Sequence, residues 1–429
     1  TTGMSARAMD VPFGANQYPV TVLERELPSG VRAVLLDAPD LFDRDGLYGD
    51  ASGDYKDNAF RFAVLCRGAL EFARVTGLRP SVIHAHDWQG GLAPVYARTE
   101  LADDPVIGGV RTVFTIHNLA FQGLFDSMEL QWINLDRGIY HPGALEYWGQ
   151  ASALKGGVVF SDVVTTVSPT YAREILGAQF GFNFQGILQN RATNLVGILN
   201  GIDTKVWDPA ADPHLPRPYD ATDLSGKRDA KRALLETLNM PADDAALDRA
   251  VVGLVSRLTY QKGFDLVLEA GDRLLGPPVT YVMLGSGDRH YEDFWTSLAA
   301  RFPDRVATRL GFDDHLAHLI EAGADMFLMP SWFEPCGLNQ MYSLRYGTLP
   351  IVRATGGLED TVHDADADQA GGNGFKFYEF TADAMLNAIH RAAWGFGERE
   401  RWAAIQRRGM AEDHSWDVSA REYVKVFEG

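Results

Sequence analysis

Short runs of β-branched and other apolar residues alternate with helical stretches along most of the chain. In the first half, the apolar runs predict strands at 32–37, 81–86, 111–116 and 162–167. Between them, the pattern predicts helices over 58–75 and from about 88 to 98. This alternation is typical of a parallel sheet that is covered by helices on both faces.

The same pattern starts again in the second half. It predicts strands at 251–255, 280–284, 305–309, 326–329 and 349–352. The two series meet near 195–209, where Asn200-Gly201 marks a turn. We therefore expect an α/β protein of two doubly wound, Rossmann-like domains, residues 1–196 and 197–429, that face a cleft. An amphipathic helix over 415–427 is expected near the end of the second domain.

The chain before residue 32 is poor in strand patterns. The segment 18–25 has the pattern of a strand, whereas 1–15 is predicted to be irregular. A doubly wound sheet usually opens with a buried strand that runs into a glycine-rich turn. Because the sequence shows no such unit here, we expect the N-terminal domain to lack its first strand and its glycine-rich loop.

Composition narrows the class of protein. Apolar residues make up 46% of the 429 residues and charged residues 22%, as in an ordinary folded globular chain. The chain has 39 Lys and Arg against 57 Asp and Glu, a formal net charge of −18, so we expect no nucleic-acid partner. Two cysteines make no disulfide framework, and no apolar run approaches the ~20 residues of a membrane span. Since we also find no signal peptide, we expect a cytoplasmic protein without a membrane partner.

Candidate chemistry lies where predicted strands end. Asp87 and His117 each follow a strand of the first series, at the edge where ligands bind in open α/β sheets. The alternatives are that Asp87 caps a helix and that His117 is a loop residue facing water. His84 and His86 share one strand face, which makes a metal site conceivable. We do not favour that site, because no third and fourth ligand follow at a motif spacing.

Two cations follow the first strand of the second series. Arg257 and Lys262 bracket a turn that leads into a helix from about residue 265. Cations beside a helix N-terminus make a local anion site on an otherwise acidic chain. The alternative is a pair of solvated surface cations, but the loop position favours a phosphate site.

Two later loops have similar positions. Glu334 lies in a loop between the strand at 326–329 and a helix from about residue 338. Gly356-Gly357 precede another helix, and a glycine pair lets backbone approach a ligand closely. A Gly-Gly pair by itself is also a common turn, but two such loops in register are less easily explained in that way.

A series of ordered motifs runs from about residue 36 to the end of the chain. They are LDAPDLFDR, HAHDWQGGLAP, TIHNLAFQG, TVSPTYAREI, GILNGIDTKVWDP, VSRLTYQKGFDL, PSWFEPCGLNQMYSLRYGTLP and RATGGLEDTV. Together they resemble the family of bacterial glycogen synthases and plant starch synthases. The resemblance implies a GT-B fold and a retaining, metal-independent glycosyltransferase without a cofactor. The implied reaction passes glucose from ADP-glucose to the non-reducing end of an α-1,4-glucan, in glycogen biosynthesis.

The resemblance also implies roles for single residues. Arg257 and Lys262 would bind the donor phosphates, and Glu334 would lie near the donor sugar. Phe312 stands where the family places an aromatic ring on the adenine. Without a metal, the two cations and the helix N-termini must stabilise the leaving diphosphate.

Other implied contacts surround the sugar. His117 and Asp87 would contact the glucose from the N-terminal domain, and Asn200 would lie close to it at the hinge. Two loop backbones would line the rest of the site: Cys336-Gly337-Leu338 and Thr355-Gly356-Gly357.

Two departures bear on the function. Glu334 is followed eight residues later by Tyr342 instead of a second Glu, which favours the glycogen and starch synthase branch over sucrose- or trehalose-type transferases. The family's first strand and its Lys-x-Gly-Gly-Leu loop would lie before residue 1. A glucan synthase is the leading hypothesis. The alternatives are a GT-B transferase with a small acceptor, and a non-catalytic or impaired fragment that binds nucleotide sugar or glucan.

Overall fold

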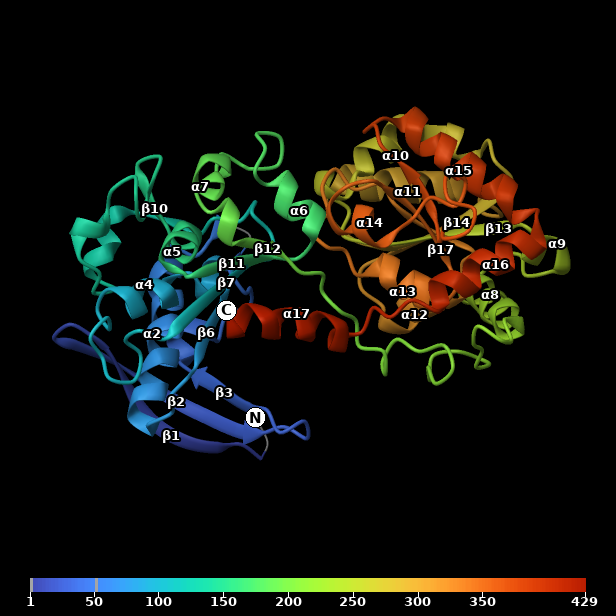
Figure 1. Ribbon diagram of the computed structural model, residues 1–429. Helices are drawn as coiled ribbons and strands as arrows, with labels where there is room; N and C mark the ends of the chain where they lie inside the picture. Colours follow the sequence, from blue (N-terminus) through green and yellow to red (C-terminus); the bar gives the residue numbers. More distant parts are fainter. Residues whose placement is uncertain (1–2, 51–52) are drawn as a thin grey trace. The chain divides into compact units, whose positions relative to one another are not determined.

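The chain folds into two compact units, which a computed structural model describes for residues 3–50 and 53–429 (Figure 1). The first unit contains the described residues up to Thr166, with Ile175–Val196 and Lys425–Gly429. The second contains Val167–Glu174 and Gly197–Val424. Residues 167–174 thus pack with the second unit, although the sequence analysis groups them with the N-terminal domain.

A parallel sheet forms the centre of the first unit. Its strands follow the order β12 (Leu195–Gly197), β11 (Val163–Thr166), β7 (Arg111–Ile116) and β6 (Val82–His86). Helix α5 (Ala153–Phe160) packs tightly on β7, because a Cβ atom at Gly157 would come within 2.4 Å of the Phe114 ring. Asp87 and His117 directly follow the carboxyl ends of β6 and β7.

An antiparallel sheet precedes this one and corrects two expectations. It consists of β1 (Ser5–Phe13), β2 (Asn16–Glu26) and β3 (Arg32–Asp37), in that order. The expectation of irregular structure over 1–15 is wrong for 5–13, although residues 1 and 2 lie outside the described range. The strand at 32–37 exists but pairs antiparallel with β2, so it is not part of the parallel series.

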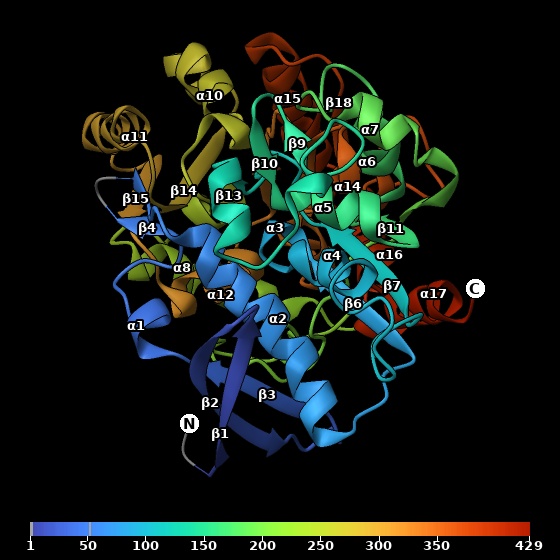
Figure 2. The same cartoon turned by 90° about the vertical axis from the view of Figure 1, so that its left-hand side faces the viewer.

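Alternation of buried and exposed positions explains the first of these strands. Met9, Val11 and Phe13 are buried on one face of β1, and the residues between them are exposed or half-buried. Helix α2 (Asn58–Thr76) covers this sheet, as Figure 2 shows. The contact is close at Gly68, where an added Cβ atom would lie 2.6 Å from the Leu36 side chain.

The second unit is built on a longer parallel sheet. Its strands follow the order β15 (Val306–Leu310), β14 (Val279–Gly285), β13 (Ala250–Val255), β16 (Met326–Met329), β17 (Leu349–Arg353) and β18 (Phe375–Phe377). Every recorded pairing within it is parallel. The chain moves outward from β13 first to β14 and β15, and then returns to β16 on the other side. The carboxyl ends of β13 and β16 therefore form a topological switch point, where doubly wound sheets bind ligands.

Helices cover both faces of this sheet and form two cores. Val252 and Leu254 of β13 belong to one core, whereas Val251 on the opposite face belongs to the other. The first core includes α10 (Phe264–Ala270), α11 (Arg289–Arg301), α15 (Ala382–Phe396) and α16 (Arg399–Met410). The second includes α8 (Ser225–Thr237), α12 (Asp314–Gly323) and α14 (Gly356–Thr361). Burial on both faces explains the almost continuous apolar runs of these strands.

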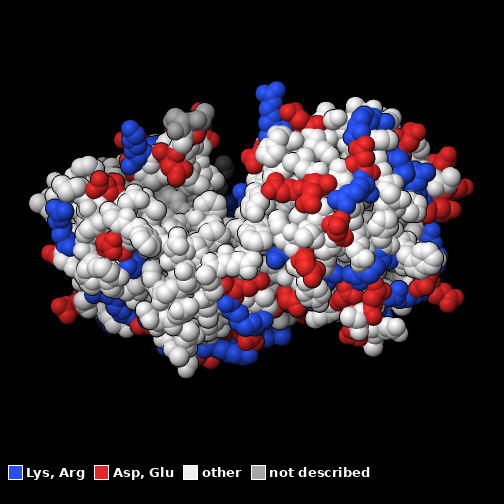
Figure 3. All heavy atoms as spheres, turned by 90° about the horizontal axis from the view of Figure 1, so that it is seen from above, with Lys and Arg blue, Asp and Glu red and all other residues white. Residues whose placement is uncertain are grey.

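Helix α17 (Trp416–Glu428) lies where the sequence predicts a terminal helix. On the face shown in Figure 3, acidic side chains are interspersed with basic ones. Within the described residues, no helix combines the length and apolar character needed to cross a membrane.

Candidate functional site

Three loops meet at the switch point of the second unit. They follow β13, β16 and β17 and contain Arg257 and Lys262, Glu334 with 336–338, and 355–357, which the sequence analysis singles out. The Trp332 backbone N–H donates to the Gln261 carbonyl at 2.9 Å, which joins the first two loops. Gly263 makes this contact possible: its φ is +76°, and a Cβ atom there would lie 1.8 Å from the Pro330 carbonyl oxygen.

An ion pair stands at the centre of these loops. The Lys262 ammonium donates to Glu334 Oε2 at 2.6 Å, and Ser331 Oγ donates to the same oxygen at 3.0 Å. The Glu334 side chain is only 6% exposed and that of Lys262 21%. The structure thus brings these two predicted residues into direct contact. Nearby in sequence, Arg257 is exposed, and no ion pair engages it within the described residues.

The predicted glycine loop packs against the Glu334 loop. Gly356 has a φ of +47°, and a Cβ atom added at this position would lie 1.9 Å from the Glu334 carbonyl oxygen. A Cβ atom on Gly357 would lie 2.1 Å from the Cys336 carbonyl oxygen. The close approach of two loop backbones is therefore sufficient reason for both glycines. The sequence analysis instead attributes them to the approach of a ligand.

A carboxylate that the sequence analysis missed holds this loop. Glu174 ends α6 (Pro169–Glu174) and accepts hydrogen bonds from Thr355 Oγ1 at 3.0 Å and from the Gly356 N–H at 3.1 Å. Burial raises the pKa of Glu174, while these two donors act in the opposite direction. Its position in the motif TVSPTYAREI is the sequence signal that could have drawn attention to it.

A second carboxylate strengthens the same attachment. Asp360 of α14 accepts from Ser168 Oγ at 2.5 Å and from the Thr170 N–H and Oγ1 at 2.9 and 2.5 Å. Residues 167–174 are thus bound to α14 at two points. These bonds explain why this segment packs with the second unit.

The loop 336–338 lies against the predicted hinge. Cys336 is buried, and its thiol accepts a hydrogen bond from the Asn200 backbone N–H. The Asn200 side-chain oxygen Oδ1 is buried and has no hydrogen-bond partner within the described residues. A buried acceptor without a partner is suited to a ligand hydroxyl. Gly337 has a φ of +73°, and Leu338 is 37% exposed.

Phe312 lies beyond the end of β15, on the same carboxyl edge of the sheet. Its ring is 89% exposed, which is unusual for a large aromatic side chain. No other predicted site residue shares its loop. Phe312 is therefore free to contact a ligand, and the structure does not bring it into the ion-paired centre.

The first unit holds the two remaining predicted residues. Asp87 begins the short helix α3 (Asp87–Gly90) with a φ of +50°, and its Oδ1 accepts from the His117 N–H at 2.7 Å. Burial raises the pKa of Asp87, against the effect of His117. The structure thus joins Asp87 to His117 and makes the carboxylate a support for the His117 loop.

The neighbouring histidines form a line along the strand ends. His86 Nδ1 lies 3.0 Å from His117 Nε2, and His84 Nε2 lies 2.6 Å from Thr115 Oγ1. Burial lowers the pKa of His84 to about 3 and that of His86 to about 4, so both rings are neutral at pH 7. Each ring therefore has a partner other than a metal ion.

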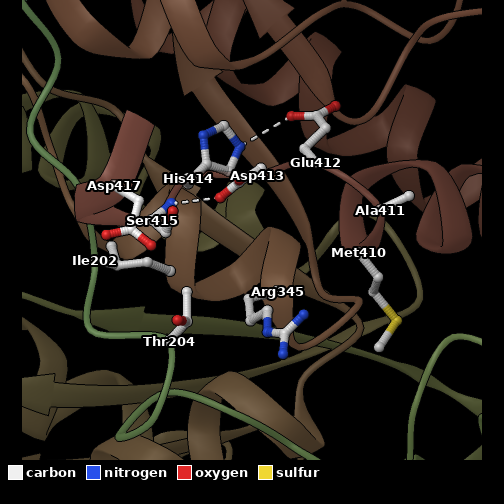
Figure 4. A pocket seen from close by; sticks show the side chains of 10 residues that line it. All are labelled: Ile202, Thr204, Arg345, Met410, Ala411, Glu412, Asp413, His414, Ser415 and Asp417. Atoms are coloured by element: carbon white, nitrogen blue, oxygen red, sulfur yellow. Dashed lines mark hydrogen bonds and ion pairs between the residues drawn. The ribbon is translucent and has the colours of Figure 1, made fainter. Parts of the chain in front are cut away.

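A pocket lies elsewhere in the second unit, where α17 begins (Figure 4). Its volume is about 340 Å³, and Arg345, Glu412, His414 and Asp417 are among its lining residues. None of the predicted site residues lines it. His414 Nε2 is paired with Glu412 at 2.9 Å, so part of its polar lining is already engaged.

Two family models match the chain. The model described as the starch synthase catalytic domain matches residues 2–190. The model described as glycosyl transferases group 1 matches residues 238–408. The second match contains the ion pair and the loops 336–338 and 355–357.

Proteins with known names are similar over nearly the whole chain. Glycogen synthase from Anaeromyxobacter dehalogenans is 51% identical over 410 residues, which cover 95% of this chain and 85% of the relative. Glycogen synthase from Koribacter versatilis is 44% identical over 424 residues, covering 99% and 87%. Among solved structures, the catalytic domain of Starch Synthase IV from Arabidopsis thaliana, bound to ADP and acarbose, has a TM-score of 0.90 at 32% identity and covers 99% of this chain and 88% of that one. This likeness confirms the GT-B fold class that the sequence predicts.

Proposed function

Since this chain belongs to the glycogen synthase family, we propose that it elongates an α-1,4-glucan by transferring glucose from ADP-glucose to the non-reducing end, with retention of configuration. The names of the relatives support the glucan product. The ADP bound to the similar plant starch synthase supports the adenine nucleotide as donor.

The ion pair at the switch point carries this proposal. In glycosyl transfer, the bond from the anomeric carbon to the diphosphate oxygen breaks, and the diphosphate leaves with the bonding electrons. The acceptor oxygen bonds to that carbon and passes its proton to the leaving diphosphate. Positive charge develops on the sugar and negative charge on the diphosphate. Lys262 and Glu334 lie 2.6 Å apart and carry the complementary charges. We assign Lys262, with Arg257, to the diphosphate and Glu334 to the sugar side.

Further residues support the placement of the donor. The unpartnered Oδ1 of Asn200 can accept a hydrogen bond from a sugar hydroxyl. The exposed ring of Phe312 offers a stacking surface to adenine. We assign Asp87 and His117 of the first unit to the glucose, with Asp87 acting in part by holding the His117 loop at 2.7 Å.

We also propose that no metal takes part in the transfer. Two cations, Arg257 and Lys262, follow β13 at the edge where the diphosphate is expected. They supply positive charge that a divalent ion supplies in other phosphate-transfer sites. Turnover should therefore continue in excess EDTA. Loss of turnover on chelation that Mg²⁺ or Mn²⁺ restores would contradict this assignment.

The variant Glu334→Gln tests the central proposal. It keeps the shape of the side chain and an acceptor for Ser331, but removes the charge. We expect kcat for glucan elongation to fall by about 10²–10³, since the loss of one preorganised electrostatic contact typically has this effect. ADP binding, measured by calorimetry, should persist because Arg257 and Lys262 remain.

The matched control is Glu400→Gln, an exposed carboxylate near the start of α16 in the same unit. It should leave kcat unchanged. Thermal melts of both variants establish that the fold is intact. Turnover of Glu334→Gln near that of the wild type would refute the assignment. Elongation by a single glucose without longer products would point to a small acceptor.

A further inference from the structure

Arg353 is the last residue of β17 and stands two residues before the glycine loop 355–357. It is buried, with 8% of its surface exposed. Its guanidinium Nη1 donates to the Trp332 carbonyl at 2.5 Å and, over a longer distance of 3.4 Å, to the Ser331 carbonyl. A side chain from β17 thus holds the backbone of the loop that follows β16 and contains Glu334.

The guanidinium also lies against two aromatic rings. Its carbon atom is 5.3 Å from the centre of the Trp332 ring and 5.5 Å from that of the Phe380 ring. Cation–π contacts of this kind are stronger where water is excluded. The Tyr260 ring lies 6.4 Å from Trp332 and 6.2 Å from Phe380. Because Tyr260 belongs to the same loop as Lys262, the aromatic cluster links the two loops that form the ion pair.

Stability alone gives little reason for an arginine at this position. Within the described residues, no carboxylate forms an ion pair with Arg353, and its Nε is buried without a hydrogen-bond partner. Burial lowers the pKa of Arg353, and the nearby Glu174 carboxylate opposes this only in part. A buried charge and a buried N–H without a partner both disfavour folding. Such a group therefore calls for another explanation.

The contacts of the guanidinium lead to Glu334 by two short routes. Ser331, whose carbonyl it holds, donates through Oγ to Glu334 Oε2 at 3.0 Å. Trp332, whose carbonyl it also holds, donates its N–H to the Gln261 carbonyl at 2.9 Å. The residue after Gln261 is Lys262, which donates to the same Glu334 oxygen at 2.6 Å. Both side chains that contact Glu334 Oε2 are thus placed by backbone that the guanidinium holds directly or through one hydrogen bond.

We propose that Arg353 is a positioning residue for glucosyl transfer, which holds the loop 331–334 so that the Glu334 carboxylate keeps its place. Its role rests on the function proposed above, and in particular on the assignment of Glu334 to the sugar side. The effect should appear in kcat, because it passes through Glu334. Binding of ADP should depend on it little, since Arg257 and Lys262 are assigned to the diphosphate.

The variant Arg353→Met tests this role in the full chain. It keeps an apolar stem of similar length but removes the charge and the donors. We expect kcat for glucan elongation to fall by about 10²-fold, as a small misplacement of a reacting group can cause. The dissociation constant of ADP, measured by calorimetry, should change little. Arg353→Lys keeps the charge but lacks the planar fork, so it should recover only part of kcat.

A double-mutant cycle with Glu334→Gln distinguishes positioning from a general loss of structure. If Arg353 acts through Glu334, kcat of Glu334→Gln/Arg353→Met should be close to that of Glu334→Gln alone, because residues that act as a unit have non-additive effects. Independent effects would instead multiply to a loss of about 10⁴–10⁵. Multiplied losses, or wild-type kcat in Arg353→Met, would overturn the role of Arg353 and leave that of Glu334 intact. Near-wild-type turnover of Glu334→Gln would refute the proposed function, and the role of Arg353 with it.

The matched control is Arg305→Met, at the opposite end of the same sheet. Arg305 directly precedes β15, and it too holds backbone carbonyls: its Nε donates to Val279 at 2.6 Å and its Nη2 to Pro277 at 2.8 Å. Arg305→Met should lower the melting midpoint but leave kcat unchanged below that midpoint. Equal losses of kcat in Arg305→Met and Arg353→Met would overturn the proposal.

Circular dichroism shows whether each variant is folded. Should Arg353→Met not fold, Arg353→Lys takes its place in the cycle with Glu334→Gln. Multiplied losses in that second cycle would equally overturn the proposal, whereas kcat close to that of Glu334→Gln alone would support it.

Discussion

Asp325 ties three elements of the second unit together at the end of the sheet opposite the site. It lies directly before β16, and its Oδ2 accepts from the Lys231 ammonium of α8 at 2.7 Å and from the Val251 N–H of β13 at 2.8 Å. The Lys231 ammonium also donates to the Arg249 carbonyl at 2.7 Å. Side-chain exposure is 4% for Lys231 and 12% for Asp325, so this is a buried ion pair.

The variant Asp325→Ala should therefore be strongly destabilising. It leaves the Lys231 ammonium buried without its counter-charge and the Val251 N–H without its acceptor. Removing one partner of a buried pair typically lowers the free energy of unfolding by about 3–5 kcal/mol. For a unit of this size, each kcal/mol shifts the melting midpoint by about 2–4 °C. We expect the midpoint of the second unit to fall by about 6–20 °C.

The double variant Lys231→Met/Asp325→Leu should lose less than Asp325→Ala alone. It removes both charges, and the remaining penalty is chiefly the unpaired Val251 N–H, about 1–3 kcal/mol. Differential scanning calorimetry of the full chain measures both midpoints. Hydrogen exchange of peptides from β13, compared with peptides from α2 of the first unit, shows which unit has lost stability.

The control is Asp272→Ala, which breaks an exposed ion pair with Arg301 in the same unit. Exposed pairs contribute little, so the midpoint should hardly change. The reasoning would be refuted by equal shifts for Asp272→Ala and Asp325→Ala. A double variant as unstable as Asp325→Ala would refute the part that attributes the effect to the uncompensated charge.

Further expectations concern pH, thiol reactivity and the donor loop. Burial lowers the pKa of His84 to about 3 from its ordinary 6.5. Between these two pH values, the unfolded chain binds a proton at His84 that the folded chain does not. The first unit should lose stability as pH falls from about 6.5 towards 3, and His84→Gln should flatten the pH dependence of its urea midpoint. Burial raises the pKa of the Cys66 and Cys336 thiols to about 12, so a colorimetric thiol reagent should titrate neither in the native protein and both in urea. Glu174→Ala should lower kcat/KM for ADP-glucose at least tenfold, because it frees the Gly356 loop. Glu174→Gln keeps an acceptor for the Gly356 N–H and should recover part of this loss. Equal kcat/KM values for the two variants would contradict a positioning role.

Much of the parallel sheets could be predicted from local patterns. The strands at 111–116 and 326–329 have the predicted bounds, because apolar runs of that length are buried on both faces and are flanked by helices. The contact between Lys262 and Glu334 follows from the same logic. Both residues come after parallel strands, and neighbouring parallel strands end at the same edge.

Other features depend on contacts that local sequence does not encode. The first strand was missed because only alternate positions from Met9 to Phe13 are buried, and polar residues stand between them. The run at 32–37 was identified as a strand, but its antiparallel pairing with β2 depends on the hairpin before it. The contacts of Glu174 with Thr355 and of Asp212 with His318 span 181 and 106 residues, beyond the reach of any periodic pattern.

The glycines of the site show how packing and chemistry depend on each other. Their motif predicts a loop that leaves space for a ligand. Gly356 is, however, also required by packing, because any side chain at this position would place its Cβ atom 1.9 Å from the Glu334 carbonyl oxygen. The approach lets the Gly357 N–H donate to that carbonyl oxygen at 3.2 Å, and the Glu334 carboxylate in turn accepts from Lys262. Glu174 holds the same glycine from the other side, because its carboxylate accepts a hydrogen bond from the Gly356 N–H. A residue without a side chain therefore determines where the charged pair stands, although it has no chemistry of its own.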